Sequence, residues 1–222
     1  MNVLTAPKFH ATWFLAFFAA GVAFDALAQY TEFFAPKAGP SPAVILISGV
    51  SGPALYRDYG RAVAELGYVA VLVSGKDVSN QSGESAENFN RIVASVRADP
   101  RVRPGKVAVV GFSLGGGGAL LYAANRADVV ASVVAYYPAV AILPSIAEAA
   151  RRVSVPTLVL AGEKDRYNRC CFIESIREFE TAARAAGAQV TVVAYPDAEH
   201  GFNLKVPTFR AADAADAWAR TQ

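Results

Sequence analysis

Short apolar runs alternate with longer amphipathic segments along most of the chain. The run at residues 43–47 is continuously apolar, as expected of a strand that is buried on both faces of a sheet. Five later apolar runs also predict strands, at residues 69–73, 107–110, 129–136, 157–161 and 189–194. Residues 30–35 are suited to an edge strand that precedes all of these.

The segments between these runs predict helices. They lie at residues 55–66, 84–97, 114–124, 146–152, 172–186 and 208–220. Strands that alternate with helices predict βαβ units, and therefore an α/β fold with a mostly parallel, doubly wound sheet. Right-handed crossovers place the loops after the strands at one edge of the sheet, where ligands bind. Since no gap is long enough for a large cap domain, we expect an open site at that edge.

The most informative motif is a G-x-S-x-G sequence centred on Ser113, between a predicted strand and a predicted helix. In this context the motif is typical of a nucleophile elbow, in which glycines allow a strained turn and a close approach of substrate. Four glycines at residues 115–118 open the helix, and each costs about 1 kcal/mol relative to alanine, so a strand or a ligand must pack closely there. The alternative is a buried turn of a nucleotide-type fold that merely contains a serine.

A serine nucleophile requires a base, and the chain has only two histidines, His10 and His200. His10 lies in a predicted targeting segment, so a working base in the mature protein is His200, which follows the last predicted strand. A histidine on a surface loop is the alternative interpretation.

The acid that orients the base is expected between the serine and the histidine in the chain. Asp165 follows the strand at residues 157–161 and lies at the same sheet edge. Glu163 is the main rival, whereas Asp197 and Glu199 lie too near His200 in sequence to reach its ring at the required angle. We therefore predict that Asp165 orients the imidazole and stabilises its charged form.

Two backbone amides are expected to bind the oxyanion. The first is that of Leu114, because the elbow leaves the first amides of the following helix unpaired. The second comes from the loop after the strand at residues 43–47, where the Val50 N–H is the best candidate.

At these residues the chain resembles the dienelactone hydrolase family of α/β-hydrolases. The resemblance spans residues 42–205 and rests on three motifs, which are Gly-Phe-Ser-Leu-Gly-Gly at 111–116, Gly-Glu-Lys-Asp at 162–165, and Tyr-Pro followed by Glu-His-Gly-Phe at 195–202. It implies an α/β-hydrolase fold without a large cap, acting on small esters or lactones with Ser113, Asp165 and His200 as a triad. Family members that open dienelactone have a cysteine nucleophile and a glutamate in the early loop, where this chain has Ser113 and Gly49. This difference argues for a serine esterase of the wider family.

The expected activity is hydrolysis of a small-molecule ester or lactone through an acyl-enzyme on Ser113, with no cofactor and no metal. An acyltransferase or a peptidase could use the same triad. A catalytically silent binding protein on this fold is a third possibility.

Length and composition agree with one domain. The chain has 222 residues, of which 54% are hydrophobic, and this is enough for a substantial core. The net charge is +2 and there is no basic block, so the sequence does not indicate a nucleic-acid partner.

Residues 1–28 are similar to a secretory signal peptide. Lys8 precedes an apolar run at residues 13–24, and alanines at positions 26 and 28 predict cleavage before Gln29. The run is short for a bilayer span, although an uncleaved anchor is the alternative. We expect an exported protein, periplasmic or extracellular, whose domain comprises residues 29–222 and keeps no stable membrane span after cleavage.

The two cysteines are adjacent, at Cys170 and Cys171. A disulfide between neighbouring residues is strained, so we favour packing of one or both thiols against the helix at residues 172–186. A disulfide between the two is the alternative in an oxidising compartment. Two pairs of residues lie after predicted strands at the active edge, which is the edge of the sheet where the site is expected. Tyr136 and Tyr137 are expected to be buried, whereas the pair at residues 76–77 either contacts substrate or lies in a solvated loop.

Overall fold

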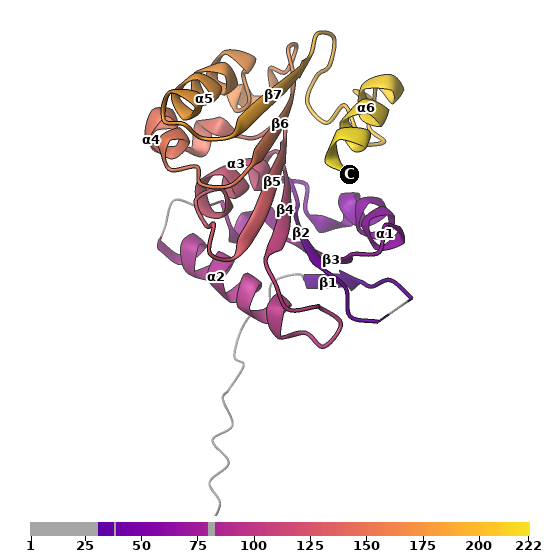
Figure 1. Ribbon diagram of the computed structural model, residues 1–222. Helices are drawn as coiled ribbons and strands as arrows, with labels where there is room; N and C mark the ends of the chain where they lie inside the picture. Colours follow the sequence, from indigo (N-terminus) through magenta and orange to yellow (C-terminus); the bar gives the residue numbers. More distant parts are fainter. Residues whose placement is uncertain (1–30, 38, 80–82) are drawn as a thin grey trace, which may run out of the picture.

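The computed structural model describes residues 31–37, 39–79 and 83–222 (Figure 1). Its strands are β1 (Thr31–Phe34), β2 (Ala43–Ile47), β3 (Val69–Val73), β4 (Val107–Phe112), β5 (Val130–Tyr136), β6 (Thr157–Gly162) and β7 (Val190–Tyr195). Its α-helices are α1 (Arg57–Glu65), α2 (Gly83–Ala98), α3 (Leu114–Gly118), α4 (Ile146–Arg151), α5 (Ile173–Ala185) and α6 (Ala211–Thr221).

The strands form one sheet in the order β1-β3-β2-β4-β5-β6-β7. Only β1 is antiparallel to its neighbour, β3, and the other pairs are parallel. The chain moves outward from β2 to β3 and then returns to β4 on the other side of β2. The order of the strands therefore reverses between β2 and β4, which is where such sheets bind ligands.

Helices cover both faces of the sheet. Helices α1 and α6 lie on one face, and α2, α3, α4 and α5 lie on the other (Figure 1). Side chains alternate along each strand, so one strand contributes to two cores. In β2, Ile45 and Ile47 pack in the core beneath the larger group of helices, whereas Val44 and Leu46 pack in the core beneath α1 and α6. This arrangement confirms the predicted doubly wound α/β fold.

Three predicted helices differ in detail from the sequence-based expectation. The first begins later, at Arg57, because Pro53–Tyr56 is a 3₁₀ turn. The helix expected at 114–124 is short, and it continues as a π-helical turn at Ala119–Ala123, in which the Ala124 N–H donates to the Ala119 carbonyl. The last helix begins at Ala211 because the preceding residues form turns, in which the Arg210 N–H donates to the Phe202 carbonyl.

The predicted signal segment, residues 1–28, lies outside the described residues. Among the described helices, none is both long and apolar enough to cross a membrane. Tyr136 and Tyr137 are buried, at 0% and 1% exposure, as predicted.

Candidate active site

Ser113 lies on a strained turn between β4 and α3. Its φ of 52° and ψ of −113° are unfavourable for a residue with a side chain, and such strain persists only where the surroundings enforce it. Backbone hydrogen bonds hold Ser113 in this conformation. The Ser113 N–H donates to the Tyr136 carbonyl (3.0 Å), and the Ser113 carbonyl accepts from the amides of Gly117 (3.0 Å) and Ala139 (2.9 Å).

The glycines after Ser113 are required by close backbone packing. A Cβ on Gly115 would lie 2.3 Å from the Ile47 carbonyl oxygen, and one on Gly118 would lie 2.2 Å from the Val78 carbonyl oxygen. Neither contact leaves room for a methyl group, because the obstructing atoms are backbone. The close neighbours that the glycine run predicted are therefore the end of β2 and the loop after β3.

His200 lies in the loop after β7, and its Nε2 is 2.9 Å from the Ser113 Oγ. The next residue, Gly201, has a φ of 75°, which turns the chain sharply. The Thr208 hydroxyl donates to the His200 carbonyl at 2.6 Å. The loop thus holds the imidazole against Ser113 from the backbone side.

Asp165 lies on the other side of the imidazole. Its Oδ2 is 2.7 Å from the His200 Nδ1, and its Oδ1 accepts from the Tyr167 N–H at 3.0 Å. The carboxylate is buried, with 1% exposure, so both of its oxygens are fixed by these contacts. The structure therefore brings Ser113, His200 and Asp165 into one line of hydrogen bonds.

The rival carboxylates, Glu163, Asp197 and Glu199, are all exposed. Asp197 pairs with Lys164 at 2.8 Å, and this contact lowers the pKa of the Asp197 carboxyl. Of the four carboxylates considered from the sequence, Asp165 is the one that hydrogen-bonds to the imidazole.

Two tyrosines enclose the imidazole, and sequence reasoning gave neither a role at the site. The Tyr167 ring stacks on His200 with centroids 4.4 Å apart and planes 11° apart. Tyr137 meets the same ring edge-on at 4.7 Å. Their positions in the sequence could have indicated this, because one lies just after Asp165 and the other at the end of β5. Both places are at the sheet edge where the site was predicted.

The predicted oxyanion donors belong to two segments next to Ser113. Leu114 is the first residue of α3, so its N–H has no partner within the helix. Val50 lies in the loop after β2 and lines the same cavity as Ser113. This loop approaches the elbow closely, because a Cβ on Gly49 would lie 3.3 Å from the Ser113 Cβ. The Gly49 backbone also hydrogen-bonds to the Tyr56 hydroxyl, whose pKa burial raises to about 12.

A cavity of about 400 Å³ opens over Ser113 and His200. This volume is in the range of pockets for small molecules. Apolar side chains from several loops line it, including Leu55, Leu204, Val206 and Pro207, and charged groups come from Lys164, Arg166 and Glu199.

Lys76 and Asp77 are not among the residues that line this cavity. Lys76 is exposed, as the solvated-loop interpretation expects, whereas Asp77 is half-buried and burial raises the pKa of its carboxyl.

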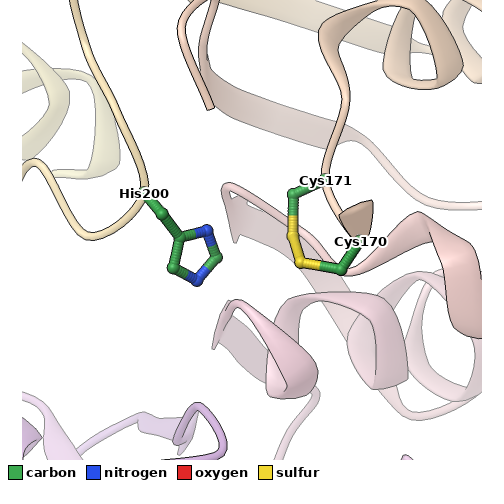
Figure 2. A group of neighbouring side chains, drawn as sticks. All are labelled: Cys170, Cys171 and His200. Carbon is green, nitrogen blue, oxygen red and sulfur yellow. A yellow bond between two sulfur atoms is a disulfide. The ribbon is translucent and has the colours of Figure 1, made fainter. Parts of the chain in front are cut away.

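The two cysteines form a disulfide, so the favoured interpretation of packed thiols was wrong and the alternative of a vicinal disulfide holds. The disulfide lies in the loop between β6 and α5, at residues 163–172, which we call the acid loop because it carries Asp165. Asn168 and Arg169 adopt left-handed backbone conformations, with φ of 44° and 57°. This turn directs both sulfur atoms toward the imidazole of His200, as Figure 2 shows.

Comparisons with known proteins agree with this fold. The model of the dienelactone hydrolase family matches residues 72–222. Proteins named "putative carboxymethylenebutenolidase" are similar to the chain. The one from Yersinia pestis is 32% identical over 212 residues, covering 82% of this chain and 76% of that protein. The one from Escherichia coli K12 is 30% identical over 209 residues, covering 82% and 75%.

Solved structures show the same architecture. The "Putative Dienelactone Hydrolase" of Klebsiella pneumoniae has a TM-score of 0.76 at 22% identity, covering 87% of this chain and 90% of that one. The dienelactone hydrolase-like promiscuous phosphotriesterase P91, from metagenomic libraries, has a TM-score of 0.71 at 20% identity with the same coverage. With the family match and the curated relatives, the conclusion is that this chain belongs to the dienelactone hydrolase family and is a hydrolase with the α/β-hydrolase fold.

Proposed function

We propose that the protein is a serine hydrolase that cleaves a small ester or lactone through an acyl-enzyme on Ser113. The observation that carries the proposal is the line of hydrogen bonds from Asp165 through His200 to Ser113, at a cavity that is open to solvent. A nucleophile, a base and a group that orients the base are the parts that acyl transfer requires.

In the first step the Ser113 Oγ attacks the substrate carbonyl carbon, and the His200 Nε2 accepts the serine proton. The distance of 2.9 Å between these atoms is within hydrogen-bonding reach for such a transfer. The imidazolium that forms is stabilised by the buried Asp165 carboxylate at 2.7 Å. Because that carboxylate is hydrogen-bonded to His200 and to the Tyr167 N–H, it holds the proton on Nδ1 and leaves Nε2 free to act as the base.

The negative charge that develops on the carbonyl oxygen is stabilised by the N–H groups of Leu114 and Val50. Amides that are already oriented toward this oxygen lower the barrier without reorganisation during the reaction. His200 then donates its proton to the leaving alcohol, and the carbon–oxygen bond of the ester breaks. In a lactone this alcohol stays attached to the acyl chain. A water molecule, deprotonated by His200, finally hydrolyses the acyl-enzyme.

The cavity supports small substrates with an apolar acyl part. Its walls are mostly apolar, and its volume of about 400 Å³ suits a molecule of modest size. The curated relatives are named for a lactone hydrolase, which supports the same class of substrate. Ser113 and Gly49 stand where dienelactone-opening relatives have cysteine and glutamate, so we propose simple esters and lactones rather than dienelactone.

Turnover of short p-nitrophenyl acyl esters, lactones and peptide anilides by the wild type and by Ser113→Ala tests this function. We expect the wild type to hydrolyse the esters or lactones in preference to the anilides, and Ser113→Ala to be inactive. Preference for anilides would instead indicate a peptidase. A wild type that is inert to all three, and is not labelled by a fluorophosphonate, would support a binding protein.

We also propose that the protein is exported. The Cys170–Cys171 disulfide supports this, because disulfides persist mainly in oxidising compartments. Protein isolated from the periplasm or the medium should begin at Gln29. Full-length protein recovered from the membrane fraction and beginning at Met1 would contradict the proposal.

A further inference from the structure

The Cys170–Cys171 disulfide lies directly beside the imidazole that we propose as the catalytic base. One ligand atom of each residue, the two Sγ atoms and a ring nitrogen of His200, lies within 4.8 Å of the others. Figure 2 shows the disulfide facing the imidazole ring, with the two cysteines contributed by the acid loop and the histidine by the loop after β7. The proposed mechanism gives these sulfur atoms no role.

We propose that reduction of this disulfide creates a binding site for a soft divalent metal ion, such as Zn²⁺, with Cys170, Cys171 and His200 as ligands. Two thiolates and an imidazole are ligands that zinc prefers in proteins. In tetrahedral zinc sites, with Zn–S bonds of about 2.3 Å and Zn–N bonds of about 2.0 Å, ligand atoms lie roughly 3.5–3.8 Å apart. The three atoms here are already within 4.8 Å of one another, so small movements of the side chains are sufficient.

The reaction that opens the site is thiol–disulfide exchange with a dithiol. Two electrons and two protons pass from the dithiol to the protein, so that the sulfur–sulfur bond breaks and two cysteine thiols form, while the dithiol becomes a cyclic disulfide. Cys171 is buried, with 1% exposure, but Cys170 is partly exposed and can be attacked. The metal then displaces the two thiol protons, since thiolates are the ligating form.

Metal binding at this site removes the proposed base from the reaction. His200 contacts Asp165 through Nδ1 and Ser113 through Nε2. A metal ion on Nε2 occupies the lone pair that would accept the serine proton. A metal ion on Nδ1 displaces the contact with Asp165. Either geometry prevents proton transfer from Ser113. While the disulfide is intact, its sulfur atoms do not bind the metal ion, and His200 can act as the base.

Co²⁺ is a suitable probe, because its bonds to thiolates give an intense absorption that does not depend on catalysis. Wild-type protein is reduced with dithiothreitol, desalted without oxygen and titrated with Co²⁺. Oxidised wild type and the reduced double variant Cys170→Ser/Cys171→Ser are the matched controls. We expect a thiolate-to-cobalt absorption band that saturates at one ion per chain in the reduced wild type and is absent from both controls. No band in the reduced wild type, or the same band in all three proteins, would overturn the proposal.

The role of His200 is tested by the effect of saturating Zn²⁺ on ester hydrolysis, which rests on the proposed function. The rate of each protein with Zn²⁺ is divided by its own rate without Zn²⁺, so differences in basal activity between the proteins do not affect the comparison. We expect Zn²⁺ to lower the rate of the reduced wild type roughly 10²-fold, the scale of general-base catalysis, and to leave both controls nearly unchanged. A cobalt band without this inhibition would contradict ligation by His200. A cobalt band in a protein that hydrolyses no ester would support the metal site and refute the proposed function instead.

Discussion

At the scale of single residues, Asp165 gives the clearest test of how the site is oriented. Asp165→Asn should lower kcat roughly 10³–10⁴-fold, because the amide no longer holds the proton on Nδ1 of His200 or stabilises the imidazolium. Glu163→Gln is the matched control, since Glu163 lies in the same loop, is exposed and is not hydrogen-bonded to the imidazole. Steady-state hydrolysis of a p-nitrophenyl ester measures both. A larger loss in Glu163→Gln would transfer the role to Glu163.

Tyr167 gives a second test at this scale, because its ring is stacked on His200. Tyr167→Ala should lower kcat roughly fivefold to tenfold, as expected when an aromatic contact of about 1 kcal/mol no longer holds the imidazole. Tyr167→Phe keeps the ring and should retain most of kcat. Equal losses in the two variants would show that the hydroxyl, rather than the stacking, is important.

The residues of the site differ in how far the sequence predicts them. Ser113 has a local motif, and His200 follows from the small number of histidines, so both are predictable without a structure. Tyr167 is not, because stacking depends on the path of the acid loop. For the same reason the sequence left two alternatives open for Cys170 and Cys171, and the favoured one, packed thiols, was wrong. The left-handed residues before them turn both sulfur atoms toward His200, and nothing in the local sequence indicates that direction.

At the scale of secondary-structure elements, Glu180 joins α5 to β7. Its buried carboxylate accepts from the Val192 N–H at 3.2 Å and pairs with Arg177 and Arg184, both at 3.0 Å. These contacts lie away from the cavity over Ser113, so they affect the position of the helix rather than the chemistry.

Glu180→Ala should lower the free energy of unfolding by about 2 kcal/mol, because it leaves the Val192 N–H without its acceptor and two arginines without their partner. Urea denaturation measures the change. Glu178→Ala, on the exposed face of the same helix, should change the free energy by less than about 0.5 kcal/mol. A similar loss in both variants would mean that helix propensity, rather than the link to β7, is responsible.

Most elements are predictable from the sequence because apolar runs of strand length are unambiguous in a buried parallel sheet. The boundaries of helices are harder to predict from the sequence. The segment expected as one helix at 114–124 changes to a π-helical turn after Gly118, where its glycines pack against backbone from other parts of the fold. Such contacts are set by the tertiary structure and have no periodic signal.

At the scale of the whole molecule, buried tyrosines join the active edge to the core beneath α1 and α6. Burial raises the pKa of Tyr56 to about 12 and raises that of Tyr59, Tyr136 and Tyr137 as well. Each hydroxyl is therefore neutral in the folded protein at a pH where it would ionise in the unfolded chain. Their contribution to stability is fully present below pH 10, the unfolded value, and is lost as the pH rises through the folded values.

We therefore expect the free energy of unfolding to fall between pH 10 and about pH 12, with tyrosinate absorbance appearing as the fold is lost. Tyr56→Phe should reduce this fall by about 2 kcal/mol, since its own shift is removed. Tyr68→Phe, at an exposed position, serves as the control. Circular dichroism with chemical denaturation at each pH measures the change. If the free energy of unfolding fell equally steeply with pH in Tyr56→Phe and in the wild type, the raised pKa of Tyr56 would not be the cause of the fall.

If the proposed mechanism operates, Ser113 carries the acyl group during turnover. The most direct measurement is mass spectrometry of protein that is mixed with p-nitrophenyl acetate, quenched in acid before deacylation and digested. We expect the peptide that contains residue 113 to gain one acetyl group in the wild type and none in Ser113→Ala. Acetyl transfer to another residue during productive turnover, or turnover at the wild-type rate by Ser113→Ala, would contradict the proposed mechanism.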